Sequence, residues 1–196
     1  MTQIEFLFFG PPRFRVNGAA VKINRRKAVA LAVFLAVTAR PHSREKLAAM
    51  FWPESDGPRS RASLRKALWL ITKVLGKTWL NIDRETISFV PHEDLEVDVN
   101  RFLKLTAVLS RNKLREEPDS PKHSKTDPID SGQPATDRAR PEQIKALEEA
   151  AQIHKASFLS GFFLNHAPDF EDWQTEQAQR LDRLAANVLE SLTRSG

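Results

Sequence analysis

The order of the hydrophobic patterns along residues 1–90 constrains the fold of this chain more than any single motif does. A β-branched and aromatic run, Ile4–Phe9, and two short alternating segments, Phe14–Val16 and Val21–Ile23, come first, and two helical patterns follow them. A third helical pattern, Pro58–Gly76, is basic, and a hairpin pattern over residues 79–90 ends the series. Two helices joined by a short turn and followed by a hairpin are typical of a winged helix-turn-helix. We therefore expect an α+β N-terminal domain with an antiparallel sheet, three helices and a wing hairpin.

The first helix of the series, residues 25–39, is predicted to be central. It is apolar on more than one side, and its basic start followed by an apolar run imitates an export signal. The run is shorter than the roughly 20 apolar residues that span a bilayer. We therefore expect a buried helix in a cytoplasmic protein with no membrane partner. The absence of cysteine fits a reducing compartment and excludes disulfides and thiolate metal sites.

Capping signals mark the next two helices. Ser43 is the expected N-cap of the second helix, which ends at Trp52-Pro53. The third helix has an apolar stripe that includes Leu64 and Leu68, with Ser60 or Ser63 expected as its N-cap and Gly76 as its stop. This helix is basic on its other faces. The pattern favours either a DNA recognition helix or an ordinary surface helix whose cations are solvated.

The charge of the chain is divided unevenly. Residues 1–90 hold sixteen Lys and Arg against six Asp and Glu, whereas residues 91–196 hold fourteen against nineteen. Such a division favours a polyanionic partner for the first part and a different role for the second.

The second half of the chain is predicted to be all-helical. Asp98 is the expected cap of a helix over residues 99–109, and residues 142–156 and 169–192 follow with helical periodicity. Residues 110–141 contain five prolines, many charges and almost no large apolar side chain. This composition predicts a disordered insertion. The helices are expected to pack in antiparallel pairs, as in helix-hairpin repeats.

Spaced motifs in this order resemble a known family, the Streptomyces antibiotic regulatory protein (SARP) type of transcriptional regulator. The stretches that resemble its OmpR-like winged-helix domain are Phe8–Pro12, Val16–Gly18, Arg26–Ala28, Ser43–Leu47, Phe51–Glu54, Arg59–Leu64 and Leu75–Gly76. Those that resemble the following bacterial transcriptional activator domain are Val97–Phe102, Phe158–Leu164 and Glu171–Trp173.

The resemblance implies two domains, a winged helix over residues 1–93 and a tetratricopeptide-like all-α domain over residues 94–196. It implies a transcription activator that places residues 59–76 in the major groove of promoter repeats, while the helical domain mediates protein contacts. Thr72-Lys73 departs from the Leu-Arg usual in the family, which puts one phosphate contact in doubt. The helical domain is also short, so we expect the chain to be the N-terminal piece of a larger regulator.

The candidate DNA-binding residues are mostly exposed cations and hydroxyls of the basic helix. A long donor reads guanine and serine serves either base type, so the base-edge candidates are Arg59, Ser63 and Lys66. The other candidates, expected mainly at phosphates, are Ser60, Arg61, Arg65, Lys73, Arg44, Arg26 and, near the hairpin tip, Arg84. Trp69 is expected to pack against the wing or the helical domain.

Catalysis, metal binding and a cofactor are not expected. The five histidines have no ligand spacing, no glycine-rich phosphate loop is present, and the acidic cluster at 169–172 suits the start of a helix. The expected partners are double-stranded promoter DNA and either RNA polymerase or a second copy of the protein. The alternative is a protein-interaction module in which the winged helix docks a protein instead of DNA.

Overall fold

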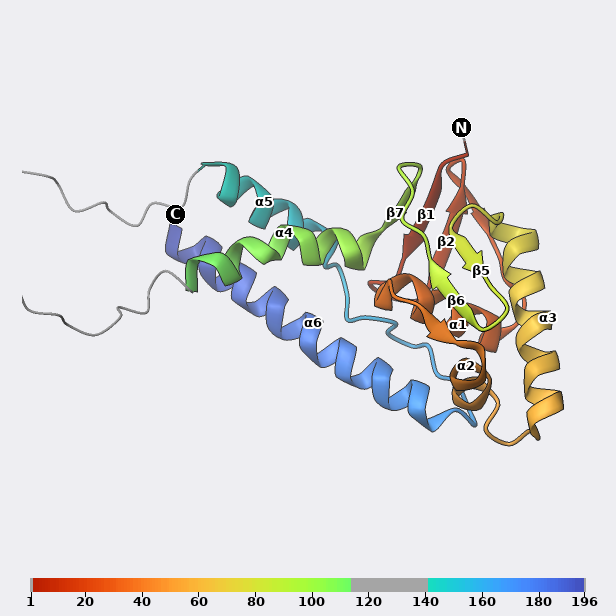
Figure 1. Cartoon of the computed structure of the whole chain (residues 1–196). Coiled ribbons are helices and arrows are strands. Elements are labelled where there is room, and N and C mark those ends of the chain that lie inside the picture. Colours follow the sequence, from red (N-terminus) through yellow and green to blue (C-terminus); the bar gives the residue numbers. More distant parts are fainter. Residues whose placement is uncertain (1, 114–140, 196) are drawn as a thin grey trace, which may run out of the picture.

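The computed structural model describes residues 2–113 and 141–195 (Figure 1). Its first sheet has the strand order β3-β2-β1-β7 and contains β1 (Ile4–Leu7), β2 (Arg13–Val16), β3 (Ala19–Val21) and β7 (Leu95–Val97). Asn17 and Gly18, both at positive φ, form the turn between β2 and β3. The predicted N-terminal hairpin turn is therefore confirmed.

The fourth strand of this sheet was not predicted. β7 pairs in parallel with β1, with Ile4 opposite Leu95 and Phe6 opposite Val97. The expectation of a purely antiparallel sheet is therefore wrong at this edge. β7 also lies beyond residue 93, where we expected the first domain to end, so a segment from the other side of that boundary completes the sheet. Three residues are too few to produce a recognisable alternation in the sequence.

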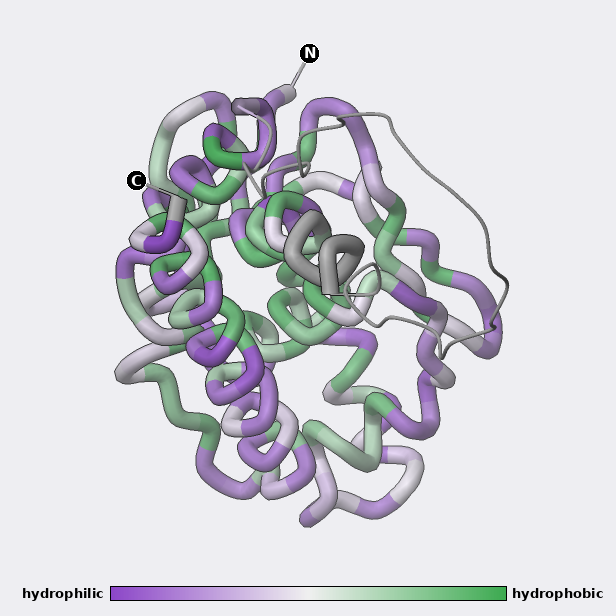
Figure 2. Tube along the Cα trace, turned by 90° about the vertical axis from the view of Figure 1, so that its left-hand side faces the viewer, coloured by the Kyte–Doolittle hydropathy of each residue, from purple (hydrophilic) through white to green (hydrophobic). Residues whose placement is uncertain are grey.

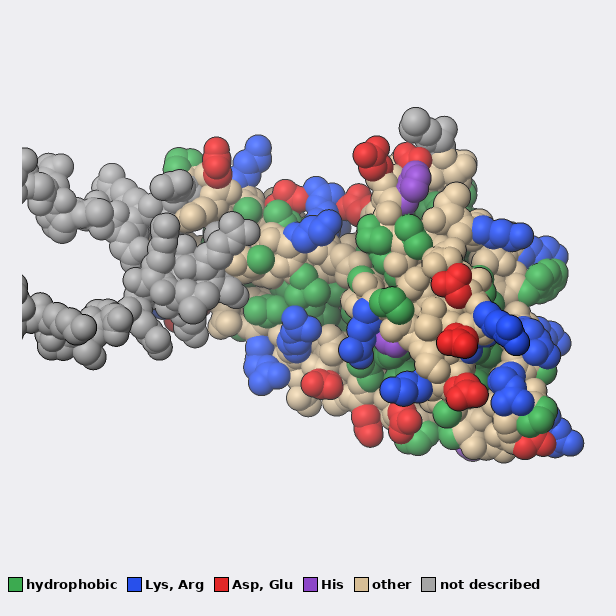
Figure 3. All heavy atoms as spheres, viewed as in Figure 1, with side chains coloured by type: hydrophobic (Ala, Val, Ile, Leu, Met, Phe, Trp, Pro, Cys, Tyr) green, Lys and Arg blue, Asp and Glu red, His purple; other side chains and the backbone are tan. Residues whose placement is uncertain are grey.

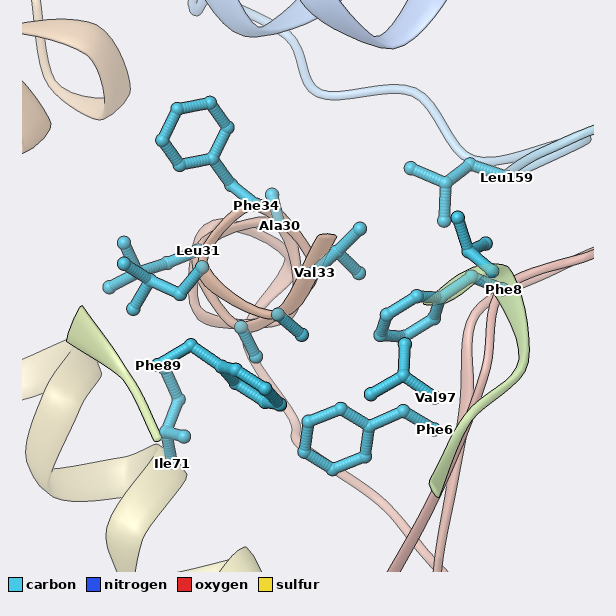
Figure 4. Close-up of a cluster of buried hydrophobic side chains, with 14 of the residues drawn as sticks. Phe6, Phe8, Ala30, Leu31, Val33, Phe34, Ile71, Phe89, Val97 and Leu159 are labelled. Atoms are coloured by element: carbon cyan, nitrogen blue, oxygen red, sulfur yellow. The ribbon is translucent and has the colours of Figure 1, made fainter. Parts of the chain in front are cut away.

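Helix α1 (Arg26–Thr38) forms the centre of the hydrophobic core, as its apolar pattern predicts. Figure 4 views it end-on, with Phe6 and Val97 of the first sheet on one side and Ile71 and Phe89 on another. The side chains of α1 from Ala30 to Ala36 are all buried. A helix enclosed on every side needs no polar face, which explains its resemblance to an export signal.

Two helices and a second sheet complete the winged helix. Helices α2 (Arg44–Phe51) and α3 (Gly57–Leu75) pack against each other, and α3 also packs on α1. The sheet has the order β4-β6-β5, from β4 (His42–Ser43), β6 (Thr86–Phe89) and β5 (Leu80–Ile82). The β5–β6 pair confirms the predicted wing hairpin. The contribution of β4, directly before α2, was not predicted.

The second half contains α4 (Asp98–Lys113), α5 (Pro141–Ile153) and α6 (Pro168–Ser195). Helix α5 packs against both α4 and α6. Figure 2 shows hydrophilic and hydrophobic positions alternating along α6, the helix that leads to the C-terminus. Residues 110–113 continue α4, so the expected insertion does not begin at residue 110; the rest of it, residues 114–140, lies outside the described residues. None of the helices in the described ranges is long and apolar enough to cross a bilayer.

The two halves share a core. Near the start of α6, the ring of Phe170 lies 5.4 Å from that of Phe51, and the ring of Trp173 lies 4.9 Å from that of Phe34. The segment between α5 and α6 also bonds to the chain after β1, because Leu159 N donates to Phe8 O at 2.9 Å. The second half is therefore held directly against the winged helix.

Asp98 ties the start of α4 to the end of β1. Its Oδ2 accepts hydrogen bonds from the backbone N–H of Phe8 at 2.7 Å and of Phe9 at 3.0 Å, and its Oδ1 accepts one from Val99 N–H at 2.7 Å. Burial raises the pKa of Asp98 to about 6, although the three N–H donors oppose this shift. The predicted capping residue thus also bonds two residues far away in the sequence.

Candidate nucleic-acid interface

The start of α3 is set by Asp56, not by a serine. The Asp56 carboxylate accepts a hydrogen bond from Arg59 N–H at 2.9 Å, and Pro58 stands in the first turn, where its missing N–H costs nothing. The predictions of Ser60 or Ser63 as N-cap are therefore wrong. The helix ends as predicted at Gly76, whose φ of 83° suits glycine.

The outward face of α3 is basic from end to end. The positions that recur every three or four residues opposite the buried stripe are Arg59, Ala62, Lys66, Trp69 and Lys73, all of them exposed. Arg61 and Arg65 are exposed on one flank of this face. The 19 residues of the helix include no Asp or Glu. Figure 3 shows Lys and Arg side chains gathered over α3 along one edge of the molecule.

Ser60 does not belong to this face. Its side chain is on the buried stripe with 5% exposure, and its hydroxyl donates to Gly57 O at 3.0 Å. The expectation that Ser60 contacts DNA is therefore wrong. Ser63 is half-buried on the flank opposite Arg61 and Arg65, so it is accessible from one side only.

The wing places Arg84 at its tip and uses Arg44 as a support. Arg84 is exposed in the turn between β5 and β6, which is closed by a 2.9 Å hydrogen bond from Asp83 N to Thr86 O. Arg44 donates twice to this turn, from Nη1 to Asp83 O at 3.2 Å and from its backbone N to Glu85 O at 2.9 Å. Arg44 thus positions the wing relative to α2, a role that the sequence did not indicate.

Comparison with known proteins finds a similar fold among solved structures. The sequence matches no family model, and no curated protein matches it. Among solved structures, one match is EmbR of Mycobacterium tuberculosis, in complex with a low affinity phosphopeptide, with a TM-score of 0.56 and 17% sequence identity. The fold resembles that of EmbR. The match covers 100% of this chain and 44% of that one, so the chain spans less than half the length of its neighbour.

At this level of identity the likeness to EmbR bears on the fold alone. It agrees with a winged helix followed by a helical part, the SARP-like arrangement expected from the sequence. Which residues contact a nucleic acid is not decided by it.

Arg26 is at the start of α1 and not on α3. Its guanidinium stacks 5.2 Å above the centre of the Phe162 ring, and the neighbouring Lys27 forms a 2.9 Å ion pair with Glu54. This pair lowers the pKa of Glu54. The start of α1 is therefore tied to the second half of the chain and to the α2–α3 turn.

Trp69 is in the middle of the basic face. Its side chain is 60% exposed, and Lys73 Nζ lies 4.9 Å from the centre of its ring. The expectation that it packs against the wing or the helical half is therefore wrong. An exposed aromatic ring on a basic face is available for contact with a partner.

Replacing Trp69 with alanine is expected to change the free energy of unfolding by no more than about 0.5 kcal/mol, because an exposed side chain loses little on truncation. Urea denaturation of both proteins measures this. The buried Trp79 provides the contrast, since its truncation to alanine is expected to cost about 3 kcal/mol or more. A large loss in the Trp69 variant would mean that the ring packs inside the protein after all.

Proposed function

We propose that this protein is a transcriptional regulator that binds duplex DNA sequence-specifically, with α3 in the major groove. It acts by binding and not by catalysis, probing base edges with Arg59, Ser63 and Lys66 and phosphates with Arg61, Arg65 and Lys73. Arg84 at the wing tip reaches a phosphate or a minor groove beside it.

One observation carries this proposal, the carboxylate-free outward face of α3. Exposed cations extend along it from Arg59 to Lys73, and Arg59 and Arg61 are in the first two turns of the helix. A helix about 10–12 Å in diameter fits a major groove about 12 Å wide. Neutralising phosphates releases counterions, which favours binding of any duplex, and the first turns of the helix then read the bases.

The helical half has a separate role in the proposal. Its exposed helices α4 to α6 mediate contacts with RNA polymerase or a second copy of the protein, which makes the protein an activator. α6 packs on α2 directly, so this half holds a defined position beside the winged helix.

Trp69 favours a second candidate function. An aromatic ring with 60% exposure at the centre of the face suits the core of a protein interface. In this alternative the winged helix docks a protein, and the cations around Trp69 form the rim.

Selection of bound duplexes from a random pool distinguishes the two functions. We expect one sequence or repeat to be enriched, and we expect its affinity to fall steeply with salt. If about five phosphates are contacted, a plot of log K against log[salt] has a slope of about −4.5. The affinity then falls about 500-fold between 50 and 200 mM salt.

A pool without enrichment, together with binding that salt barely changes, would overturn the DNA assignment. Steep salt dependence without enrichment would leave a polyanion binder and contradict sequence-specific regulation.

A further inference from the structure

A pocket at the junction of the two halves is not explained by the DNA-binding face, although Ser63 and Lys66 line both. It has a volume of about 620 Å³ and opens between the start of α1, the middle of α3 and residues 163–165. Its walls include Trp52, Ser63, Lys66 and Leu164, from parts of the chain that are far apart in sequence. Pockets of 300–1,000 Å³ are the usual size for small-molecule sites.

The lining of this junction pocket is strongly cationic. Arg25, Arg26, Lys27 and Lys66 all line it, and no Asp or Glu does. In the described part of the chain, only Lys27 among these four has a carboxylate within ion-pairing distance, that of Glu54. The first turn of α1 also lacks an acidic residue and a side-chain cap at Arg25, so its positive end adds to the potential. The resulting positive potential favours binding of an anion.

Apolar residues also line the pocket. Trp52, Ala67 and Leu164 are among them, and Phe163 is another, with 67% of its side chain exposed. An exposed phenylalanine loses hydrophobic free energy unless something covers it. A DNA phosphate backbone needs no apolar lining, whereas an anion with an aromatic body would contact both the cationic and the apolar residues of the pocket.

We propose that the junction pocket binds a small organic anion that joins a carboxylate or phosphate to an aromatic-sized apolar body. The anionic group lies among Arg25, Arg26 and Lys66, and the apolar body covers Phe163 and Leu164. Because Lys66 belongs to α3, an occupied pocket weakens duplex binding, a consequence that rests on the proposed function. By linkage, bound DNA weakens the ligand equally.

The test uses naphthyl phosphate as the probe, titrated into the full chain without DNA by isothermal calorimetry. We expect one site per chain with a Kd of about 0.1 mM, a reasonable affinity for a fragment of this size. Neutral naphthol and inorganic phosphate are each expected to bind at least about 10-fold more weakly. Naphthol lacks the anionic group for the cations, and inorganic phosphate lacks the apolar body for the apolar residues.

Two exposed residues outside the proposed DNA contacts serve as variants. Arg25→Ala and Phe163→Ala are each expected to weaken naphthyl phosphate about 10-fold, by loss of a charge-assisted contact and of an aromatic contact. Arg40→Ala, an exposed arginine just past the other end of α1, and Leu189→Ala, an exposed leucine on α6, are the matched controls and should bind as the wild type does.

Three results would overturn the proposal: no binding of the probe, equal binding of inorganic phosphate, or binding that neither pocket variant changes. Weakened duplex binding in Arg25→Ala without any binding of the probe would instead assign the cations to DNA. Because the titration contains no DNA, its outcome is independent of the duplex selection. Either proposal can therefore fail while the other succeeds.

Discussion

Replacing Arg59 and Lys66 together with alanine is expected to abolish footprint protection of a selected duplex. Both side chains are on the outward face of α3, and Arg59 forms a 3.7 Å exposed ion pair with Asp56. A contact between a cation and a base edge or phosphate contributes about 1–3 kcal/mol, so the loss of two contacts should lower the affinity at least about 30-fold. DNase footprinting and anisotropy titration measure the loss.

Lys104→Ala with Arg183→Ala is the matched control, because it removes two exposed cations from the helical half and changes the net charge equally. It should bind nearly as the wild type does. Ser60→Ala adds a second check, since its buried hydroxyl cannot reach DNA. If the Arg59 and Lys66 variant protects the duplex as the wild type does, α3 is not the recognition helix.

Replacing Asp98 with alanine is expected to lower the free energy of unfolding by about 3 kcal/mol. The change leaves the N–H groups of Phe8, Phe9 and Val99 without their acceptor, at about 1–3 kcal/mol each. Relief of the carboxylate's burial offsets part of this cost, because that burial raises the pKa of Asp98 to about 6. Urea denaturation well above that pKa measures the net effect.

Asp94→Ala is the control for this experiment. Asp94 is close by in the sequence, but its carboxylate is partly exposed and forms a 3.7 Å contact with His92. Such a pair contributes less than about 1 kcal/mol. Equal stability of the Asp98 and Asp94 variants would show that the three backbone bonds do not hold α4 to β1.

Much of the winged helix could be predicted because its signals are local. The buried stripe of α3 repeats with the helical period, Asn17-Gly18 suits a hairpin turn, and the β5–β6 hairpin alternates on both arms. The cap of α3 was predicted less well, because Asp56, Ser60 and Ser63 are all acceptable N-caps by type. Once Asp56 takes that position, the helical phase turns Ser60 toward the core.

The remaining features depend on contacts between distant residues. Arg44 was predicted from its charge, but its role is decided by the wing turn that packs beside it. Trp69 is a large apolar residue that composition alone would bury, and no neighbouring element covers it. The helical period of α3 places Trp69 opposite the buried stripe, but nothing in the surrounding residues indicates the role of Arg44.

The sequence by itself determined the order of the helices and of the strands other than β4 and β7, the buried α1 and the basic, carboxylate-free α3, because helical and strand periodicities are properties of short stretches. Only the tertiary structure decided that β7 joins β1, that Asp98 binds the backbone of Phe8 and Phe9, and that four distant segments enclose the junction pocket. Such contacts arise from the packing of whole elements, which fixes distances that no local pattern encodes.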